Sequence, residues 1–136
     1  MRKHLIVLAI LCFTNSVMAQ VFTQKDLVGK WKVVAVLNEP QNPNLKDIIK
    51  SFGSATFLFE ENANFRTTTL DKTQWFTMLT DVTKEAKWKM NAANFTISVG
   101  NDANNYSILK IIVSKVGDKT VFHLDETPFN FEVQKE

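Results

Sequence analysis

The chain has 136 residues, with 16 Lys or Arg residues against 14 Asp or Glu residues. Arg2 and Lys3 lie in a segment that we expect to be removed, so the mature chain is predicted to be formally neutral. Without a basic stripe or a polybasic helix, the sequence argues against nucleic acid and against an anionic membrane surface as partners. Cys12, the only cysteine, lies in the same segment, which leaves the mature chain without disulfide or thiolate chemistry.

Residues 1–19 have the pattern of a cleavable secretory signal. The basic start precedes an unbroken apolar run over residues 5–13, and Val17 and Ala19 supply the small residues that precede a cleavage site. The run is far shorter than the roughly 20 apolar residues that span a bilayer. We therefore predict cleavage between Ala19 and Gln20, no membrane span, and a secreted or periplasmic protein with one domain over residues 20–136.

The first strand is predicted over residues 30–38, after a short turn at residues 25–29. Apolar residues alternate along this strand with a period of two, which is typical of a strand with one buried face. The alternating residues are Trp31, Val33, Ala35 and Leu37. The polar, proline-containing segment that follows ends the strand.

One helix is predicted over residues 44–53, with Asn44 as the N-cap and Gly53 as the stop signal. The apolar residues in this segment recur at the spacing of one helical face. They are Leu45, Ile48, Ile49 and Phe52. The helix either covers one end of a barrel or packs on the outside of a sheet.

From residue 54 onward, the period-two pattern returns and continues almost to residue 136. Further strands are predicted at residues 54–60, 65–69, 73–80, 86–90, 95–99, 106–116, 120–125 and 129–134. Short turns join most of them, which forces neighbouring strands to be antiparallel. The prediction is an all-β fold, an antiparallel up-and-down β-barrel of about eight strands with one short helix after the first strand.

Three segments resemble the short lipocalin-like domains of secreted bacterial proteins, which are calycin-type β-barrels. They are residues 27–33 with the Gly-x-Trp pattern of Gly29 and Trp31, the hairpin at residues 57–65, and the tryptophan hairpin at residues 86–99. The resemblance implies a barrel that binds a small molecule. It also implies that Trp31 packs across the closed end as a structural residue, under a basic side chain from a late strand, for which the last strand offers only Lys135.

One consistent register places a set of apolar side chains on the predicted inward face. The set consists of Phe57, Phe59, Phe65, Trp88, Phe95, Ile97, Phe129 and Phe131. An eight-stranded barrel is wide enough either to be filled by side chains or to hold one small ligand. We expect these residues to bind a small, mainly apolar ligand. The alternative is a filled barrel that acts as a non-catalytic envelope or secreted protein-interaction module.

The polar residues form no recognisable catalytic pattern, so we expect no enzymatic activity, no metal and no cofactor. Arg66 is predicted to face solvent opposite Phe65, unless a bulge turns it inward to receive a ligand carboxylate. His123 is the only histidine after residue 19, and Asp125 is expected on the same strand face, where it could orient the imidazole. Without further His or Cys residues, His123 does not build a histidine metal site.

Overall fold

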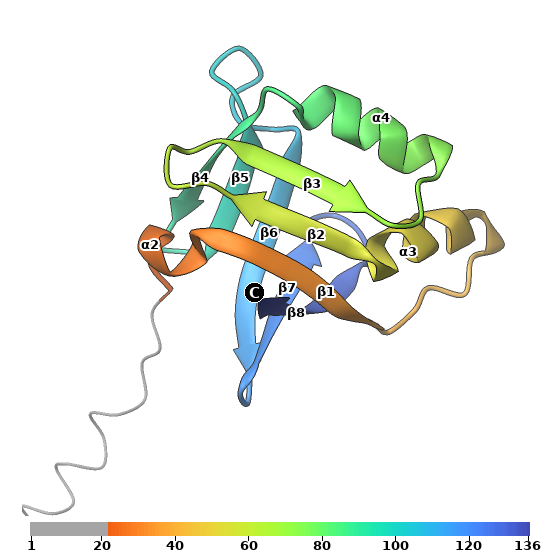
Figure 1. Cartoon of the computed structure of the whole chain (residues 1–136). Helices are drawn as coiled ribbons and strands as arrows, with labels where there is room; N and C mark the ends of the chain where they lie inside the picture. Colours follow the sequence, from red (N-terminus) through yellow and green to blue (C-terminus); the bar gives the residue numbers. More distant parts are fainter. Residues whose placement is uncertain (1–21) are drawn as a thin grey trace, which may run out of the picture.

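A computed structural model describes residues 22–136 and confirms the all-β class. The predicted signal segment lies outside the described residues. The eight strands form one antiparallel sheet in the order β3-β2-β1-β8-β7-β6-β5-β4, a meander in which β1 also pairs with β8 (Figure 1). The strands are β1 (Gly29–Leu37), β2 (Ala55–Phe59), β3 (Phe65–Thr69), β4 (Lys87–Asn91), β5 (Thr96–Gly100), β6 (Leu109–Val116), β7 (Lys119–Leu124) and β8 (Asn130–Lys135).

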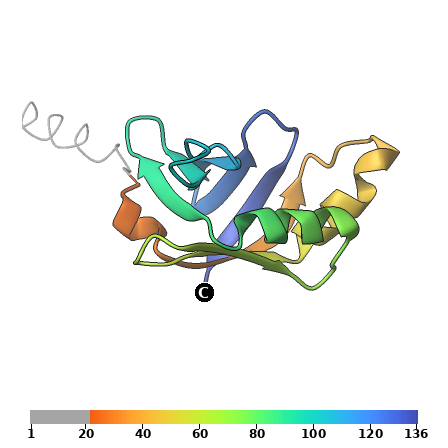
Figure 2. The ribbon, with the colours of Figure 1, turned by 90° about the horizontal axis from the view of Figure 1, so that it is seen from above.

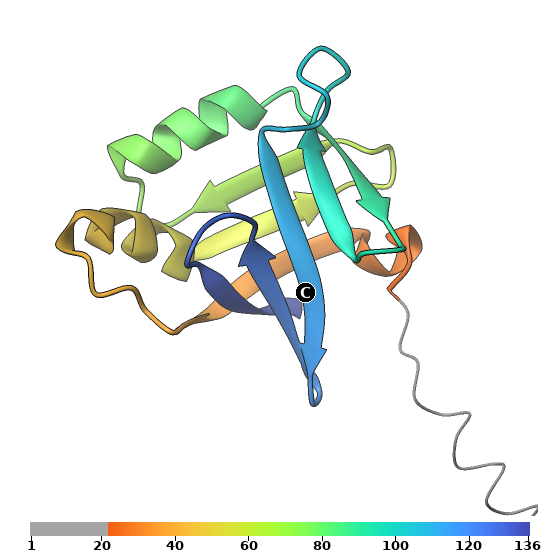
Figure 3. The ribbon, with the colours of Figure 1, turned by 180° about the vertical axis from the view of Figure 1, so that it is seen from behind.

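The sheet curves into a nearly closed barrel. The two edge strands of the sheet, β3 and β4, are connected by one isolated antiparallel β-bridge, between Asn64 and Lys87. Beside this bridge, the Phe65 N–H donates to the Ala86 carbonyl at 3.0 Å and the Trp88 N–H donates to the Ala63 carbonyl at 2.9 Å. Beyond the bridge the strands diverge, and helix α4 (Gln74–Thr83) connects them across the gap; Figure 3 shows β4 to β8 from behind.

The strand predicted at residues 73–80 is wrong, because this segment forms helix α4. Thr73 caps the helix, because its side chain accepts a hydrogen bond from the Phe76 N–H at 3.3 Å. Phe76, Leu79 and Thr83 form the buried face. Their helical spacing turns them toward the barrel, whereas a strand would have divided the apolar residues between two faces.

Helix α3 (Lys46–Gly53) lies after β1 as predicted, but its start differs. A short 3₁₀ helix η1 (Pro43–Leu45) precedes it, and Asn42 caps η1 by accepting a hydrogen bond from the Asn44 N–H at 3.0 Å. Asn44 is therefore not the N-cap. The proline within η1 fixes a backbone angle suited to this first turn, which moves the cap two residues earlier.

Phe52 shows that α3 covers one end of the barrel and does not pack on the outside of the sheet. Its fully buried ring lies 4.8 Å from the ring of Phe131 and 6.4 Å from that of Phe57, measured between centroids. Both partners are inward-facing strand residues. Figure 2 shows α3 at the end of β1 opposite to α2 (Gln24–Leu27).

Three smaller predictions also change. Residues 24–27 form helix α2, because Thr23 and Asp26 cap each other's backbone N–H groups; the prediction was a turn. A register shift between Val33 and Ala35 leaves Val34 bulged, so beyond it Val36 packs on the core in place of Ala35. The strand predicted from residue 106 begins only at Leu109, because the preceding residues form a turn.

Candidate functional site

Most of the predicted ligand-binding side chains form a packed aromatic cluster in the barrel interior. The buried members are Phe57, Phe59, Phe65, Trp88, Ile97, Phe129 and Phe131. The ring of Phe59 lies 5.1 Å from that of Trp88 and 5.5 Å from that of Phe65. These side chains are therefore each other's neighbours, as in a filled core.

Phe52 and Phe122 complete this cluster and were not among the predicted residues. Phe122 lies 5.8 Å from Phe57 and 6.1 Å from Phe59 between ring centroids. The period-two alternation along β7 could have predicted that Phe122 faces inward. The apolar stripe of α3 could have predicted the same for Phe52. The Trp88 indole N–H donates to the Glu60 carbonyl at 2.9 Å, so its buried polar group is satisfied.

Phe95 and Arg66 lie outside the cluster. Phe95 occupies the turn before β5 with a φ of 52°, which directs it away from the inward row of β5. Its ring is half-buried and packs edge-on against Phe22, with centroids 6.3 Å apart. Arg66 is exposed on the outer face of β3, beside Thr80 and Lys84 of the α4 region, so no bulge turns it inward.

An open cavity of about 420 Å³ lies at the end of the barrel that holds Phe52; we call it the mouth groove. Its lining comes from α4, from the start of β6 and from the turn between β7 and β8. The lining residues are Trp75, Leu79, Ser107, Ile108, Leu109, Lys110, Leu124, Asp125, Glu126, Thr127 and Phe129. Phe129 is the one predicted ligand-binding residue that lines it.

The β7–β8 turn that forms one wall of the mouth groove is held by local hydrogen bonds. The Thr127 hydroxyl donates to the Leu124 carbonyl at 2.7 Å and accepts from the Phe129 N–H at 3.2 Å. The Asp125 N–H donates to the Lys110 carbonyl at 2.9 Å, which ties the turn to β6. This wall is therefore preformed.

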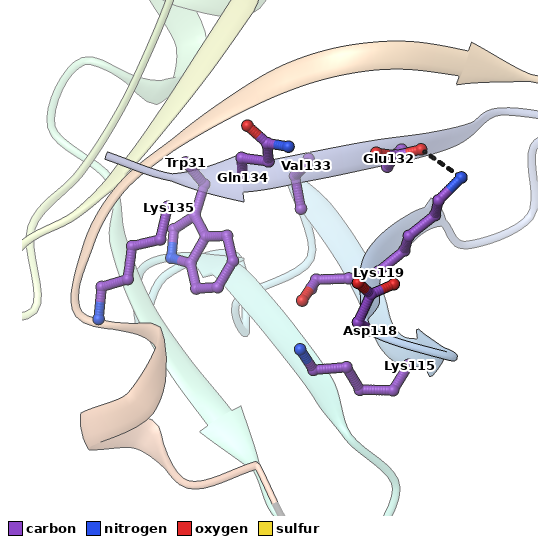
Figure 4. A pocket seen from close by; sticks show the side chains of 9 residues that line it. Trp31, Lys115, Asp118, Lys119, Glu132, Val133, Gln134 and Lys135 are labelled. Carbon is purple, nitrogen blue, oxygen red and sulfur yellow. Dashed lines mark ion pairs between the residues drawn. The ribbon is translucent and has the colours of Figure 1, made fainter.

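A second open cavity, of about 450 Å³, lies at the opposite ends of β6, β7 and β8; we call it the Trp31 cavity (Figure 4). Its lining residues are Trp31, Lys115, Asp118, Lys119, Thr120, Glu132, Val133, Gln134 and Lys135. The indole N–H of the buried Trp31 donates to the Leu27 carbonyl at 2.9 Å. Trp31 therefore joins α2 to the barrel end.

Lys135 lies over Trp31, as the resemblance implied for a late basic residue. Its Nζ is 5.9 Å from the centre of the Trp31 ring system and donates to the Asp26 carbonyl at 3.2 Å. Gly29 makes room for this side chain. With a φ of +134°, Gly29 adopts a backbone conformation that other residues rarely adopt, and an added Cβ would lie 2.8 Å from the Lys135 Cε.

Asp26 is the acidic residue next to this arrangement. Its carboxylate accepts hydrogen bonds from the backbone N–H and the hydroxyl of Thr23, each at 2.9 Å. These bonds stabilise the charged form and lower the pKa of Asp26 below its usual value, with smaller contributions from the charges of Lys135 and Lys25.

His123 is engaged in holding the β7–β8 connection. Its Nδ1 lies 3.1 Å from the Phe129 carbonyl and 3.0 Å from the Asn130 Oδ1. Asp125, the expected partner of His123, lies beyond the end of β7 and is exposed. Among residues 22–136, no three His, Cys, Asp or Glu side chains gather as a metal site.

The described fold is an antiparallel eight-stranded barrel, nearly closed and compatible with a calycin-like arrangement. No known protein family, curated protein or solved structure matches the chain. Within the described part of the chain, no helix has both the length and the apolar character needed to cross a membrane.

Proposed function

We propose that the protein is a secreted or periplasmic, non-catalytic, lipocalin-like carrier that binds a small, mainly apolar molecule in the mouth groove. The observation that carries this proposal is the groove itself. Its volume of about 420 Å³ falls in the range of roughly 300–1,000 Å³ that small-molecule sites occupy. Trp75, Leu79 and Phe129 give it an apolar wall and floor.

The packing of the interior favours the mouth groove over the barrel centre as the ligand site. Phe52 contacts Trp75 and Phe129 with ring centroids 5.5 and 5.9 Å apart, so the groove begins where the aromatic cluster ends. A ligand in the groove would cover Trp75, which is 38% exposed, without displacing a buried ring. A ligand at the centre would have to separate side chains that already contact one another.

The rim of the mouth groove suggests the kind of molecule that would bind. Lys110, Asp125 and Glu126 are exposed at the edge and carry charges of both signs. Burial of an apolar body would supply most of the binding free energy, at about 25 cal/mol per Å². A single polar group at the rim would fix its orientation. We therefore expect an amphipathic molecule with one polar group.

Titration with 1-decanol, followed by the indole N–H signals in a ¹H–¹⁵N NMR spectrum, tests this proposal. The three tryptophans are suitable reporters because Trp75 lines the mouth groove, Trp88 lies in the interior and Trp31 lies at the other end. We expect the Trp75 signal to shift in proportion to occupancy, together with the amide signals of residues 108–110, while Trp31 stays unchanged. A response of Trp88 alone would favour binding at the centre.

The variant Trp75→Ala should weaken 1-decanol binding about tenfold, which corresponds to 1.4 kcal/mol. Val116→Ala is the matched control, because Val116 is also exposed and apolar but lies at the opposite end of β6. The control should bind with unchanged affinity. Equal affinities for both variants would contradict the placement of the ligand on Trp75.

A different observation favours the alternative of a filled barrel that acts as a non-catalytic interaction module. On α4, Met78 and Val82 are 60% and 58% exposed and share one side of the helix with Trp75. Exposed apolar residues on one helix side are typical of a contact surface. If 1-decanol shifts none of the indole signals, this alternative becomes the better explanation of the groove and the helix.

A further inference from the structure

The strand register places two lysines on the inward face of the barrel at the Trp31 end. Inward residues alternate along β6 as Ile111, Val113 and Lys115, and along β8 as Phe131, Val133 and Lys135. Lys115 pairs with Thr120, Thr120 pairs with Val133, and Lys135 pairs with Trp31. On both strands, the apolar inward row therefore ends in a cation beside the same cavity.

Among the described residues neither of these lysines forms an ion pair, although the Asp26 carboxylate is near enough to Lys135 for their charges to interact. Lys119 is paired with Glu132 at 3.5 Å. Among residues 22–136, neither Lys115 nor Lys135 has a carboxylate oxygen within 4.0 Å. Asp118 also lines the cavity, from the exposed turn between β6 and β7, so the lining as a whole carries a charge of +1 from three lysines and two acids.

Lys135 lies over the ring of Trp31, whereas Lys115 reaches the same cavity from the end of β6. Figure 4 shows Lys115 extending into the cavity toward the indole ring, while Lys135 runs along its other side. The Lys115 Nζ lies 6.0 Å from the centroid of the Phe22 ring. An ammonium group has three donors, so Lys115 retains the capacity to bind an anion directly.

We propose that the Trp31 cavity is a second binding site, for a small organic anion that carries a carboxylate. The carboxylate pairs with Lys115, and the positive charge of Lys135 adds to the attraction. The apolar part of the ligand lies against the edge of Trp31, beside Val133 and Thr120, all three of which expose 6% or less of their surface. This site is independent of the mouth groove, because the two cavities lie at opposite ends of β6, β7 and β8.

An NMR titration with sodium benzoate, at low ionic strength, tests the second site. We expect benzoate to shift the Trp31 indole N–H signal and the amide signals of residues 115–120, and to leave Trp75 unchanged. Lys115→Gln should weaken benzoate binding at least fivefold. Lys32→Gln is the matched control, since Lys32 is exposed on the outer face of β1 next to Trp31, and should leave the affinity unchanged.

Three results would overturn this inference. The first is an equal loss of affinity in Lys115→Gln and Lys32→Gln, which would mean attraction by net charge alone. The second is a shift of Trp75 without a shift of Trp31. The third is equal binding of benzoate and inorganic phosphate, because the apolar part of benzoate would then contribute nothing. The 1-decanol titration is followed at Trp75 and the benzoate titration at Trp31. The results can therefore contradict either proposed site while supporting the other.

Discussion

At the scale of single residues, the positions of three residues depend on one another. These residues are Gly29, Trp31 and Lys135. The positive φ of Gly29 lets the chain turn from α2 into β1, and its missing Cβ leaves room for the aliphatic part of Lys135. Lys135 then covers Trp31 and reaches the Asp26 carbonyl. The Gly-x-Trp pattern is therefore a consequence of how α2, β1 and β8 meet.

Replacing Gly29 with alanine should destabilise the protein by about 1–3 kcal/mol, the usual cost of an unfavourable backbone conformation. The contact with Lys135 adds little, because a flexible side chain can move away. Gly53→Ala is the control: its nearest side-chain atom, the Val36 Cγ2, would lie at an ordinary 3.9 Å from the new Cβ. Urea unfolding of both variants measures the difference. Equal stabilities would show that Gly29 is not under backbone constraint.

At the scale of elements, α4 is the part of the fold that departs most from prediction. A short run such as Trp75, Phe76, Met78 and Leu79 fits both a buried strand and a helix, and period alone does not separate them. Thr73 is the local signal for the helix, because a threonine before such a run is a typical N-cap. In the fold, α4 packs along β3, the strand at one edge of the sheet.

Thr73→Ala should lower the free energy of unfolding by about 1 kcal/mol, since the capping hydrogen bond to the Phe76 N–H is lost. The Thr73 hydroxyl also lies 2.8 Å from the Ser51 Oγ, so the substitution weakens the link between α4 and α3. Thr77→Ala, at an exposed position of the same helix, should be neutral or slightly stabilising. Midpoints of chemical unfolding compare the two, and a cost at Thr77 equal to that at Thr73 would contradict the capping role.

The sequence allowed the strand order and the inward aromatic row to be predicted, because both follow from period-two alternation and short turns. It did not predict the bulge at Val34 or the left-handed turn at Phe95, since each interrupts the alternation by one residue. The mouth groove was also missed. Its walls come from three separate segments whose approach depends on α4, and α4 was expected to be a strand.

At the scale of the whole molecule, the interior is organised around Phe52. Its ring contacts aromatic residues from β2, α4 and β8, so one helix residue joins three parts of the barrel. A filled aromatic interior of this kind is a rigid support, and it holds both cavities at fixed positions on either end.

Phe52→Ala should therefore cost about 3–5 kcal/mol, the usual range for removing a buried phenylalanine. Met78→Ala is a suitable control because the Met78 side chain is exposed. Thermal unfolding followed by near-ultraviolet circular dichroism measures stability and aromatic packing together. A loss below about 1 kcal/mol would mean that the ring of Phe52 does not hold the interior together.

The pairing of β1 with β8 has a consequence for the order in which the molecule folds. During synthesis, β1 and the β2–β3 hairpin emerge early, but the inward side chains of β1 stay uncovered until β8 is available. Such sequence-distant pairing slows folding, because a long loop must close before the contacts form. A nascent chain would thus remain open for most of its synthesis.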